Sequence, residues 1–354
     1  MKNIQQIFLD EILLFVEETG KSVELNLIAQ AKINLNLNIL GKRSDNYHEL
    51  ETVMQSIALH DQIKIIANPI SQLPQDLGSQ ILLESYLADD KVNRTAINNN
   101  FDDLNEIKSN LIYKAAKSFL DFFQIKANLK IILKKQIPIS AGLAGGSTDA
   151  AATLKGLLIL FNYLHINPVN KNNFFLSSRD SCIKFKELLP MAEKIGADVP
   201  FCLHQGTALC KGKGEKIFPL QSFALRPLIL YNSALPVFTA EAFKQIDAKF
   251  FASKQLDSQS LIDQYNLQLN RGFSIMNQSW QNDFTDFLLM DHPHLQSVID
   301  LFKATDADFV RFTGSGPTLF AFYPSYTARD LAMQILSKQN LPGQLISTYT
   351  SNPR

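Results

Sequence analysis

The sequence predicts an α+β protein made of two domains. Its 354 residues exceed the roughly 100–200 residues of an average domain. Runs that alternate apolar and polar residues, typical of strands, are mixed in irregular order with runs of helical periodicity. Hydrophobic residues make up 46% of the chain and charged residues 19%, which is a globular composition. We therefore expect two cores of ordinary size rather than a disordered chain.

The charge balance and the cysteines exclude several classes of protein. Lysine plus arginine and aspartate plus glutamate number 34 each, so the net charge is zero. General nucleic-acid binders and proteins that bind anionic membranes carry an excess of basic residues. The three cysteines are odd in number and lack the spacing of zinc sites, so we expect neither a zinc site nor a disulfide framework. We predict no nucleic-acid partner, no membrane and a reducing, cytoplasmic location. A monomer and a homodimer both remain open.

The first 21 residues are predicted to form a helical extension that ends at Gly20. The apolar face of this amphipathic helix would consist of Ile4, Phe8, Ile12 and Phe15. The apolar run 12–16 is shorter than the roughly 18 residues of a membrane span. Acidic residues flank this run on both sides, so we expect neither a secretory signal nor a transit peptide.

The next segment, residues 22–223, is predicted to be the first domain. Alternating patterns predict strands at 23–28, 32–39, 50–59, 62–67 and 127–134. Helical patterns cover 110–123, 145–161 and 185–195. Polar stretches near 85–106 and 167–184 are predicted insertions without recognisable chemistry.

Residues 224–354 are predicted to be the second domain. The turn at 212–215 and Pro227 mark the boundary. We expect strands at 227–231, 309–312 and 318–323, a helix at 240–246, and two helices within 262–303.

A turn rich in glycine and other small residues, at 134–151, connects a predicted strand to a predicted helix. Glycines let several backbone N–H groups converge on an anion, and the helix start adds the positive end of its dipole, so the turn favours a phosphate. The alternative is a close strand–helix contact that needs small residues, with Ser147 or Thr148 as a helix cap. The spacing fits neither a P-loop nor the dinucleotide fingerprint, which argues against a hydride-transfer enzyme.

This turn resembles the phosphate loop of the GHMP kinases along 138–151. The segments 31–35, 41–50 and 312–320 are similar to motifs of one family among them, the 4-diphosphocytidyl-2-C-methyl-D-erythritol kinases. The segments 196–201 and 282–284 extend the match in the same order. With 31–35 and 41–50 taken as one opening motif, five motifs span most of the chain, from about 22 to 323. The resemblance implies a ribosomal-protein-S5-domain-2-like ATP-binding domain followed by a ferredoxin-like α/β domain.

The resemblance also implies the reaction, which is ATP-dependent phosphorylation of the 2-hydroxyl of 4-diphosphocytidyl-2-C-methyl-D-erythritol. ATP would be the co-substrate and magnesium the metal. Asp198 would be the general base and Lys32 would lie beside it to position the hydroxyl. Without the resemblance, Asp198 would be a turn or capping residue and Lys32 a solvated strand lysine.

The same comparison implies the residues of the nucleotide site. These are Pro138, Ser140, Ala141, Gly142, Leu143, Ala144, Gly145, Gly146, Ser147 and Thr148 of the loop, together with Asn110 and Lys135. The hydroxyl of Ser147 or Thr148 could reach magnesium, and no other metal ligand is predicted. The alternatives are a helix cap for Asn110 and a solvated strand position for Lys135.

For the acceptor site the resemblance implies six residues: Asn34, Tyr47, His48, Phe243, Gly314 and Ser315. Asn34 would contact the methylerythritol hydroxyls. Tyr47 would stack on the cytosine while His48 binds its edge, although surface packing is the alternative. Phe243 would be a second stacking residue, for which core packing is equally expected.

Four residues depart from the family pattern, namely Asn46, Ser140, Ala144 and Thr148. Ala144 is acceptable if its φ is negative, and Asn46 tolerates a left-handed conformation. Two rival functions remain, a GHMP kinase for another acceptor such as mevalonate, homoserine or a sugar, and a non-catalytic nucleotide-binding protein on the same scaffold.

Overall fold

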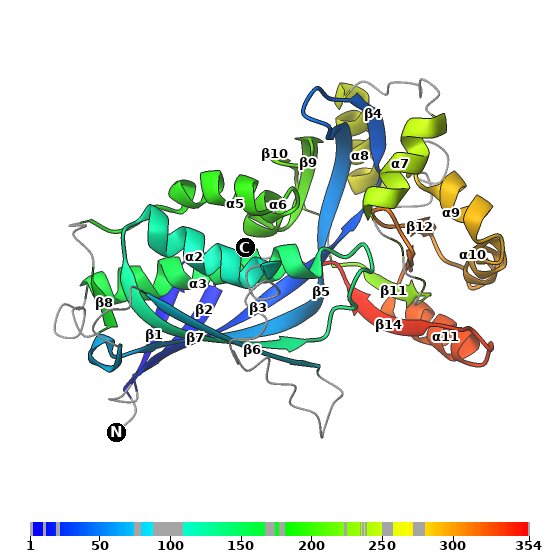
Figure 1. The fold of residues 1–354 in the computed structure, drawn as a ribbon. Helices are drawn as coiled ribbons and strands as arrows, with labels where there is room; N and C mark the ends of the chain where they lie inside the picture. Colours follow the sequence, from blue (N-terminus) through cyan, green and yellow to red (C-terminus); the bar gives the residue numbers. More distant parts are fainter. Residues whose placement is uncertain are drawn as a thin grey trace.

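Two β-sheets with their helices form the molecule, which places a larger amino-terminal unit beside a smaller carboxy-terminal one (Figure 1). The computed structural model describes residues 3–9, 12–18, 22–73, 79–87, 109–166, 174–176, 181–222, 225–233, 235, 237, 239–249, 258–271 and 280–352. Within these residues, no helix combines the length and the apolar character needed to cross a bilayer.

The amino-terminal sheet is organised around one long strand, β5 (His48–Asn68). It pairs antiparallel with β3 (Val23–Asn34) on one side and with β7 (Lys126–Lys135) on the other. The described strands run in the order β1-β2-β3-β5-β7-β6, where β1 is Asn3–Leu9, β2 is Ile12–Glu18 and β6 is Gln80–Leu87. Further strands pair with β5, β7 and β9. These further strands are β4 (Asn38–Lys42), β8 (Phe175–Leu176), β9 (Thr207–Gly212) and β10 (Lys216–Pro219). The sequence pattern predicted two strands where β5 is continuous.

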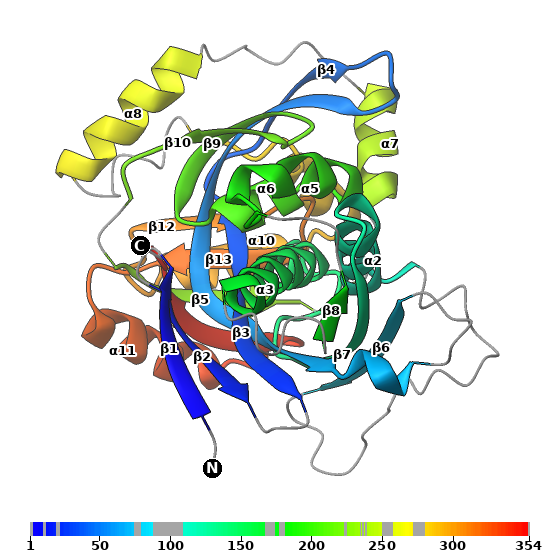
Figure 2. The ribbon, with the colours of Figure 1, turned by 90° about the vertical axis from the view of Figure 1, so that its left-hand side faces the viewer.

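Helices of the described part of the amino-terminal unit lie on one face of this sheet (Figures 1 and 2). They are α2 (Leu111–Phe122), α3 (Gly145–Ile166), α5 (Leu189–Ile195) and α6 (Val199–His204). A short 3-10 helix, η2 (Phe185–Leu188), precedes α5. Helix α3 approaches the sheet closely at Gly156, where an added Cβ would lie 2.4 Å from the Leu27 side chain. Because its sequence is mostly apolar, α3 is buried between the sheet and the other helices.

The carboxy-terminal unit has an antiparallel sheet in the order β12-β13-β11-β14. Its strands are β11 (Pro227–Asn232), β12 (Phe309–Phe312), β13 (Thr318–Phe322) and β14 (Gln344–Tyr349). Its helices are α7 (Thr239–Lys249), α8 (Ser258–Arg271), α9 (Thr285–Asp291), α10 (Leu295–Lys303) and α11 (Tyr326–Ser337). Helix α11 and strand β14 were not predicted from the sequence.

An apolar cluster joins the two units. Ile33 of β3 and Ile57 of β5 belong to the same buried cluster as Leu230 of β11 and Phe320 of β13. Because this cluster takes side chains from both sheets, burial of apolar surface holds the two sheets together and fixes the space between them.

The predicted amino-terminal helix is wrong. Strands β1 (Asn3–Leu9) and β2 (Ile12–Glu18) pair antiparallel, and β2 continues the sheet by pairing with β3 at Val23–Leu25. The run Ile12–Val16 is rich in β-branched and large apolar residues, which favour a strand where an open sheet edge is available. A helical spacing in so short a segment could not compete with this edge.

Parts of the two predicted insertions contain regular structure. The polar stretch after β5 includes η1 (Ile70–Gln72) and β6 (Gln80–Leu87), which pairs parallel with β7. The second insertion contains β8. The rest of 85–106 after residue 87 and most of 167–180 lie outside the described residues.

Candidate active site

A cavity of about 600 Å³ lies between the glycine-rich turn and the carboxy-terminal unit. It is lined by residues of strands β3 and β5, the turn at 138–146, the starts of α3 and α6, helix α7 and the loop at 314–315. Of the residues predicted for the site, all line this cavity except Tyr47, His48 and Thr148. Segments that are far apart in the chain therefore meet at one concave surface, which is the usual setting of a small-molecule site.

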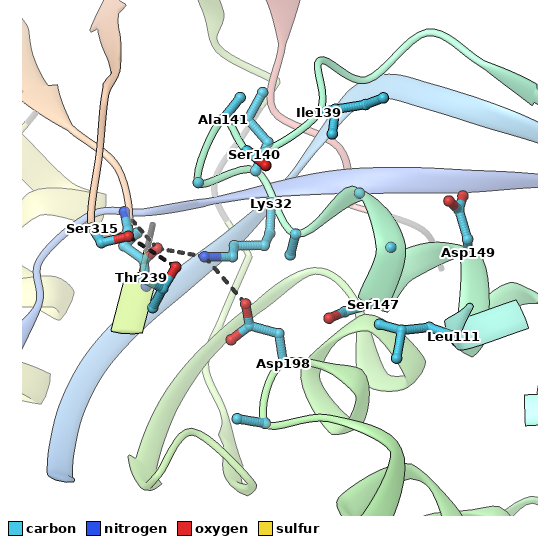
Figure 3. Close-up of a pocket in the computed structure, with 18 of the residues that line it drawn as sticks. Lys32, Leu111, Ile139, Ser140, Ala141, Ser147, Asp149, Asp198, Thr239 and Ser315 are labelled. Atoms are coloured by element: carbon cyan, nitrogen blue, oxygen red, sulfur yellow. Dashed lines mark hydrogen bonds and ion pairs between the residues drawn. The ribbon is translucent and has the colours of Figure 1, made fainter. Parts of the chain in front are cut away.

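An ion pair lies at the centre of the cavity (Figure 3). The Lys32 Nζ is 3.5 Å from Asp198 Oδ2, and Lys32 also donates a hydrogen bond of 2.7 Å to Asn34 Oδ1. Lys32 is only 4% exposed, so it is not a solvated strand lysine. Asp198 stands at the amino end of α6 without a side-chain capping hydrogen bond, and 30% of its side chain is exposed. Its carboxylate is therefore available to a ligand in the cavity.

Asn34 connects this ion pair to the carboxy-terminal unit. Its Oδ1 also accepts a hydrogen bond of 3.0 Å from the Gly314 backbone N–H, and its backbone N–H donates to Thr313 Oγ1 at 2.9 Å. Its Nδ2 donates to Thr52 Oγ1. Because both ends of its buried amide are occupied by protein groups, Asn34 holds Lys32 and the 313–315 loop in one arrangement.

The glycine-rich turn ends where α3 begins at Gly145. Backbone N–H groups of the first helical turn have no partner within a helix, so this end of α3 can bind an anion. Gly145, Gly146 and Ser147 line the cavity here. The Ser147 side chain lies on the same side of α3 as Asp198 in Figure 3.

Three residues of the turn have positive φ, namely Ser140 (55°), Gly142 (72°) and Ala144 (57°). The condition of a negative φ for Ala144 is therefore not met, and both non-glycine residues adopt a conformation that costs about 1–2 kcal/mol for an L-residue. Asn46 has φ 66°, as expected for a residue that tolerates the left-handed region.

The turn touches the carboxy-terminal loop through glycines. An added Cβ at Gly142 would lie 2.6 Å from the Thr313 carbonyl oxygen, and one at Gly314 would lie 3.1 Å from the Gly142 carbonyl oxygen. Glycine is required here because two backbones approach each other and both φ values are positive.

Thr148 does not belong to the cavity. Its side chain is 1% exposed and donates a hydrogen bond of 2.6 Å to the Gln30 carbonyl oxygen. The prediction of Thr148 as a nucleotide or magnesium ligand is therefore wrong, since its hydroxyl ties α3 to β3. The neighbouring Ser147 does line the cavity, as does Ser140 earlier in the turn.

Lys135 lies between two buried carboxylates. Its Nζ contacts Asp61 Oδ2 at 2.5 Å and Asp149 Oδ2 at 3.1 Å. Asp61 also accepts the backbone N–H groups of Gln136 and Ile137. Burial raises the pKa of Asp149 to about 7; Lys135 opposes this shift and Asp61 adds to it. The Asp149 Oδ1 lacks a partner in the described structure although it is buried.

Asn110 is a helix cap that also lines the cavity. Its Oδ1 accepts a hydrogen bond of 2.8 Å from the Ile112 N–H at the start of α2. This uses one oxygen lone pair and leaves the amide nitrogen for other partners.

Of the three residues predicted for the base end, Phe243 lines the cavity, whereas Tyr47 and His48 do not. The His48 ring stacks on Phe243 with centroids 4.5 Å apart, and Phe243 also packs edge-on against Phe284. Tyr47 is 53% exposed and Lys213 Nζ lies 4.9 Å from its ring centre. Phe243 lines the cavity, so it connects this aromatic group to the central ion pair.

Several site residues were not predicted from the sequence. Thr239, at the start of α7, shares a hydrogen bond of 3.1 Å with Ser315, and both line the cavity. Asn282 donates to the Gly314 and Phe312 carbonyl oxygens at 2.8 and 3.0 Å and so supports the 313–315 loop. Lys213, Asp61 and Asp149 were also missed. Asn282, Asp149 and Thr239 fell within segments matched to the family, and no role was assigned to them there.

The described residues contain no cluster of three or more His, Cys, Asp or Glu side chains that could hold a metal. This arrangement still fits magnesium, which is commonly bound by one or two protein oxygens and by substrate phosphates. The Ser147 hydroxyl and the Asp198 carboxylate are oxygen ligands of the required kind on the same cavity.

Comparison with protein families gives two matches. Residues 110–206 match the GHMP kinases N terminal domain, and residues 268–341 match the GHMP kinases C terminal domain. A 4-diphosphocytidyl-2-C-methyl-D-erythritol kinase of Clostridium tetani is 34% identical over 300 residues, which cover 85% of this chain and 91% of the relative. The enzyme of the same name from Brevibacillus brevis is 33% identical over 299 residues, or 84% and 87% of the two chains.

Solved structures agree in fold. A crystal structure of 4-(cytidine 5'-diphospho)-2C-methyl-D-erythritol kinase matches with a TM-score of 0.66 and 23% identity, covering 92% of this chain and 99% of the other. The mevalonate kinase of L. major matches with a TM-score of 0.60 and 16% identity, covering 92% and 95%. The predicted α+β fold of the GHMP kinases is therefore confirmed.

Proposed function

The chain belongs to the family of 4-diphosphocytidyl-2-C-methyl-D-erythritol kinases among the GHMP kinases, and we propose that it performs the reaction for which its relatives are named. It would transfer the γ-phosphoryl group of ATP to the tertiary 2-hydroxyl of 4-diphosphocytidyl-2-C-methyl-D-erythritol, in non-mevalonate isoprenoid synthesis. The observation that carries this proposal is the Lys32–Asp198 pair, which faces a cavity beside the glycine-rich turn.

Asp198 is proposed as the general base. Its carboxylate makes no capping hydrogen bond to α6 and would accept the proton of the acceptor hydroxyl as the hydroxyl oxygen attacks the γ-phosphorus. Lys32 would hold the carboxylate and orient the hydroxyl, since positioning supplies much of the catalysis in phosphoryl transfer. Asn34 would act through its hydrogen bond to Lys32 and through the cavity surface it lines.

The nucleotide is proposed to lie along the turn at 138–147, with its phosphates at the amino end of α3. Asn110 and Lys135 would line the base and ribose end. Magnesium would be held by Ser147 and the phosphates, and when bound it would neutralise charge on the transferred group. The acceptor would extend from Asp198 past Gly314 and Ser315 toward Phe243, His48 and Tyr47.

We propose a cytoplasmic location and a small-molecule substrate without nucleic-acid or membrane partners. Cys202 and Cys210 are buried free thiols, which is the state kept in a reducing compartment. The domain boundary at 223/224 and the choice between monomer and homodimer remain predictions.

The test is ADP formation by the purified protein with ATP and magnesium, with and without 4-diphosphocytidyl-2-C-methyl-D-erythritol. We expect substrate-dependent turnover that falls by about 10²–10⁴-fold in Asp198→Asn. The matched control is Asp300→Asn, which changes an exposed carboxylate on α10 and should retain full activity.

Two results would replace the proposal. Turnover with mevalonate, homoserine or a sugar, without response to the cytidine substrate, would show another GHMP acceptor. ATP binding without turnover on any of these alcohols would indicate a non-catalytic nucleotide-binding protein.

A further inference from the structure

Two charged residues and two rings form a cluster between the two units at the proposed base end of the cavity. Lys42 and His48 lie on the β4–β5 hairpin, whereas Phe243 and Asp247 lie one turn apart on α7. His48 Nε2 is 2.7 Å from Asp247 Oδ1, and Lys42 Nζ contacts Asp247 Oδ2 at 2.5 Å. The His48 ring stacks on Phe243. The His48 imidazole is therefore held at its Nε2 edge by Asp247 and on one ring face by Phe243.

His48 faces the cavity side of β5. Alternate residues of a strand share a face, so His48 lies on the face of Leu50 and Thr52, both of which line the cavity. The imidazole is only 7% exposed. A buried imidazole has two nitrogens to satisfy, and Nδ1 has no hydrogen bond to any part of the chain that the structure describes. That nitrogen is therefore available to a ligand.

Asp247 decides which nitrogen carries the proton. Hydrogen bonds from Lys42 and then from His48 lower the pKa of Asp247, so it is an ionised carboxylate that only accepts hydrogen bonds. His48 must then donate through Nε2–H. In the neutral imidazole the other nitrogen, Nδ1, is left as an acceptor, because one ring nitrogen donates and the other accepts.

We propose that Asp247 is a positioning residue that makes the acceptor site select cytosine over uracil by holding His48 with Nδ1 as the acceptor. This inference rests on the proposed function, since it places the base of the acceptor substrate at His48. Cytosine carries an amino donor at position 4, whereas uracil carries a carbonyl acceptor there. Stacking on aromatic rings accepts either base, so Tyr47 and Phe243 do not supply this discrimination.

The test compares the binding of CDP and UDP, by calorimetry, to wild type and Asp247→Asn. The asparagine amide can donate to Nε2, which would move the imidazole proton to Nδ1 and remove the acceptor. We expect Asp247→Asn to lower the CDP/UDP affinity ratio by about tenfold or more. With the full cytidine substrate, KM should rise by a similar factor while kcat stays within about twofold.

Two further variants separate this role from a structural one. Asp247→Glu keeps a carboxylate and should restore most of the affinity ratio. Asp291→Asn removes a carboxylate that binds Gln245 of the same helix away from the cluster, and it should leave the ratio unchanged. In ¹⁵N-histidine-labelled protein, the imidazole shifts of His48 should show the tautomer reversing in Asp247→Asn but not in Asp291→Asn.

Equal binding of CDP and UDP to wild type, or an unchanged ratio in Asp247→Asn, would overturn this inference. The proposed function is judged separately by ADP formation. An active kinase with an unchanged ratio would keep the function and lose the role of Asp247. Selective CDP binding that depends on Asp247, in a protein without turnover, would keep the role of Asp247 and refute the proposed kinase function.

Discussion

At the scale of single residues, the buried carboxyl of Asp149 carries a pH dependence. Its pKa of about 7 exceeds the value of about 3.9 expected in the unfolded chain, because burial disfavours the charge. Between these values the folded state binds the additional proton. The stability contributed by the protonated carboxyl is therefore fully present below about pH 4 and is lost as the pH rises through about 7.

Asp149→Asn should remove this dependence. We expect the free energy of unfolding of the variant, relative to wild type, to increase between pH 5 and pH 8 by about 1 kcal/mol or more. Urea denaturation at several pH values measures this. Asp121→Asn, which changes an exposed carboxylate paired with Lys117, should show no such trend. A parallel pair of stability curves for Asp149→Asn and wild type would contradict the expectation.

At the scale of elements, the contact between the glycine-rich turn and the 313–316 loop depends on the absence of a side chain. Gly142→Ala would place a Cβ 2.6 Å from the Thr313 carbonyl oxygen at a φ of 72°. We expect the 313–316 loop to shift by a few tenths of an ångström or more. Because displacement of groups at an active site slows the reaction, kcat/KM should fall by about 100-fold. Steady-state kinetics measures the loss.

Gly206→Ala separates the clash from the backbone strain. Gly206 also has positive φ, 71°, but its nearest neighbour would be Ser222 Oγ at an ordinary 3.5 Å. This variant should lose only about 1 kcal/mol of stability and keep its activity. If both variants lose activity equally, strain rather than the contact with Thr313 explains the effect.

Elements with strong patterns were predictable, and elements decided by distant partners were not. Helix α2 and strands β7 and β12 lie close to their predicted ranges, because each has clear periodicity or a cap. Helix α3 also does, since its run of small residues and leucines follows directly on the glycine-rich turn. The amino-terminal strand pair could not be predicted, since its strands form on a sheet edge created by β3. Strand β6 also depends on a partner, because it pairs with β7 across an intervening polar stretch.

The site residues also fall into those that sequence motifs predict and those that depend on the fold. The turn and Asp198 stood in motifs, so sequence indicated their place beside one cavity. Asp61 and Lys213 come from segments without a motif and reach the site only through the fold. Thr148 shows the reverse error, because a hydroxyl in the right motif turns to the Gln30 backbone instead of the cavity. Motifs indicate where a site lies, but side-chain direction depends on packing.

At the scale of the whole molecule, the two units meet at the reacting centre as well as at the apolar cluster between the sheets. Asn34 accepts hydrogen bonds from Lys32 Nζ in the amino-terminal unit and from the Gly314 N–H in the carboxy-terminal unit. One buried amide oxygen therefore ties the position of the lysine to the position of the loop. A change at Asn34 should affect both units at once.

Asn34→Ala should leave the buried Gly314 N–H unpaired and leave Lys32 Nζ, among the described residues, with only its contact to Asp198, at a cost of about 1–3 kcal/mol in the free energy of unfolding. We expect backbone amides at 313–316 to exchange hydrogen about tenfold faster in the variant, because a loss of about 1.4 kcal/mol corresponds to that factor. Asn162→Ala is the matched control, since Asn162 binds the Ile183 backbone within the amino-terminal unit. It should lower stability without a selective effect at 313–316. If both variants change exchange at this loop equally, Asn34 contributes only to global stability, and the coupling of the two units would have to come from the apolar cluster.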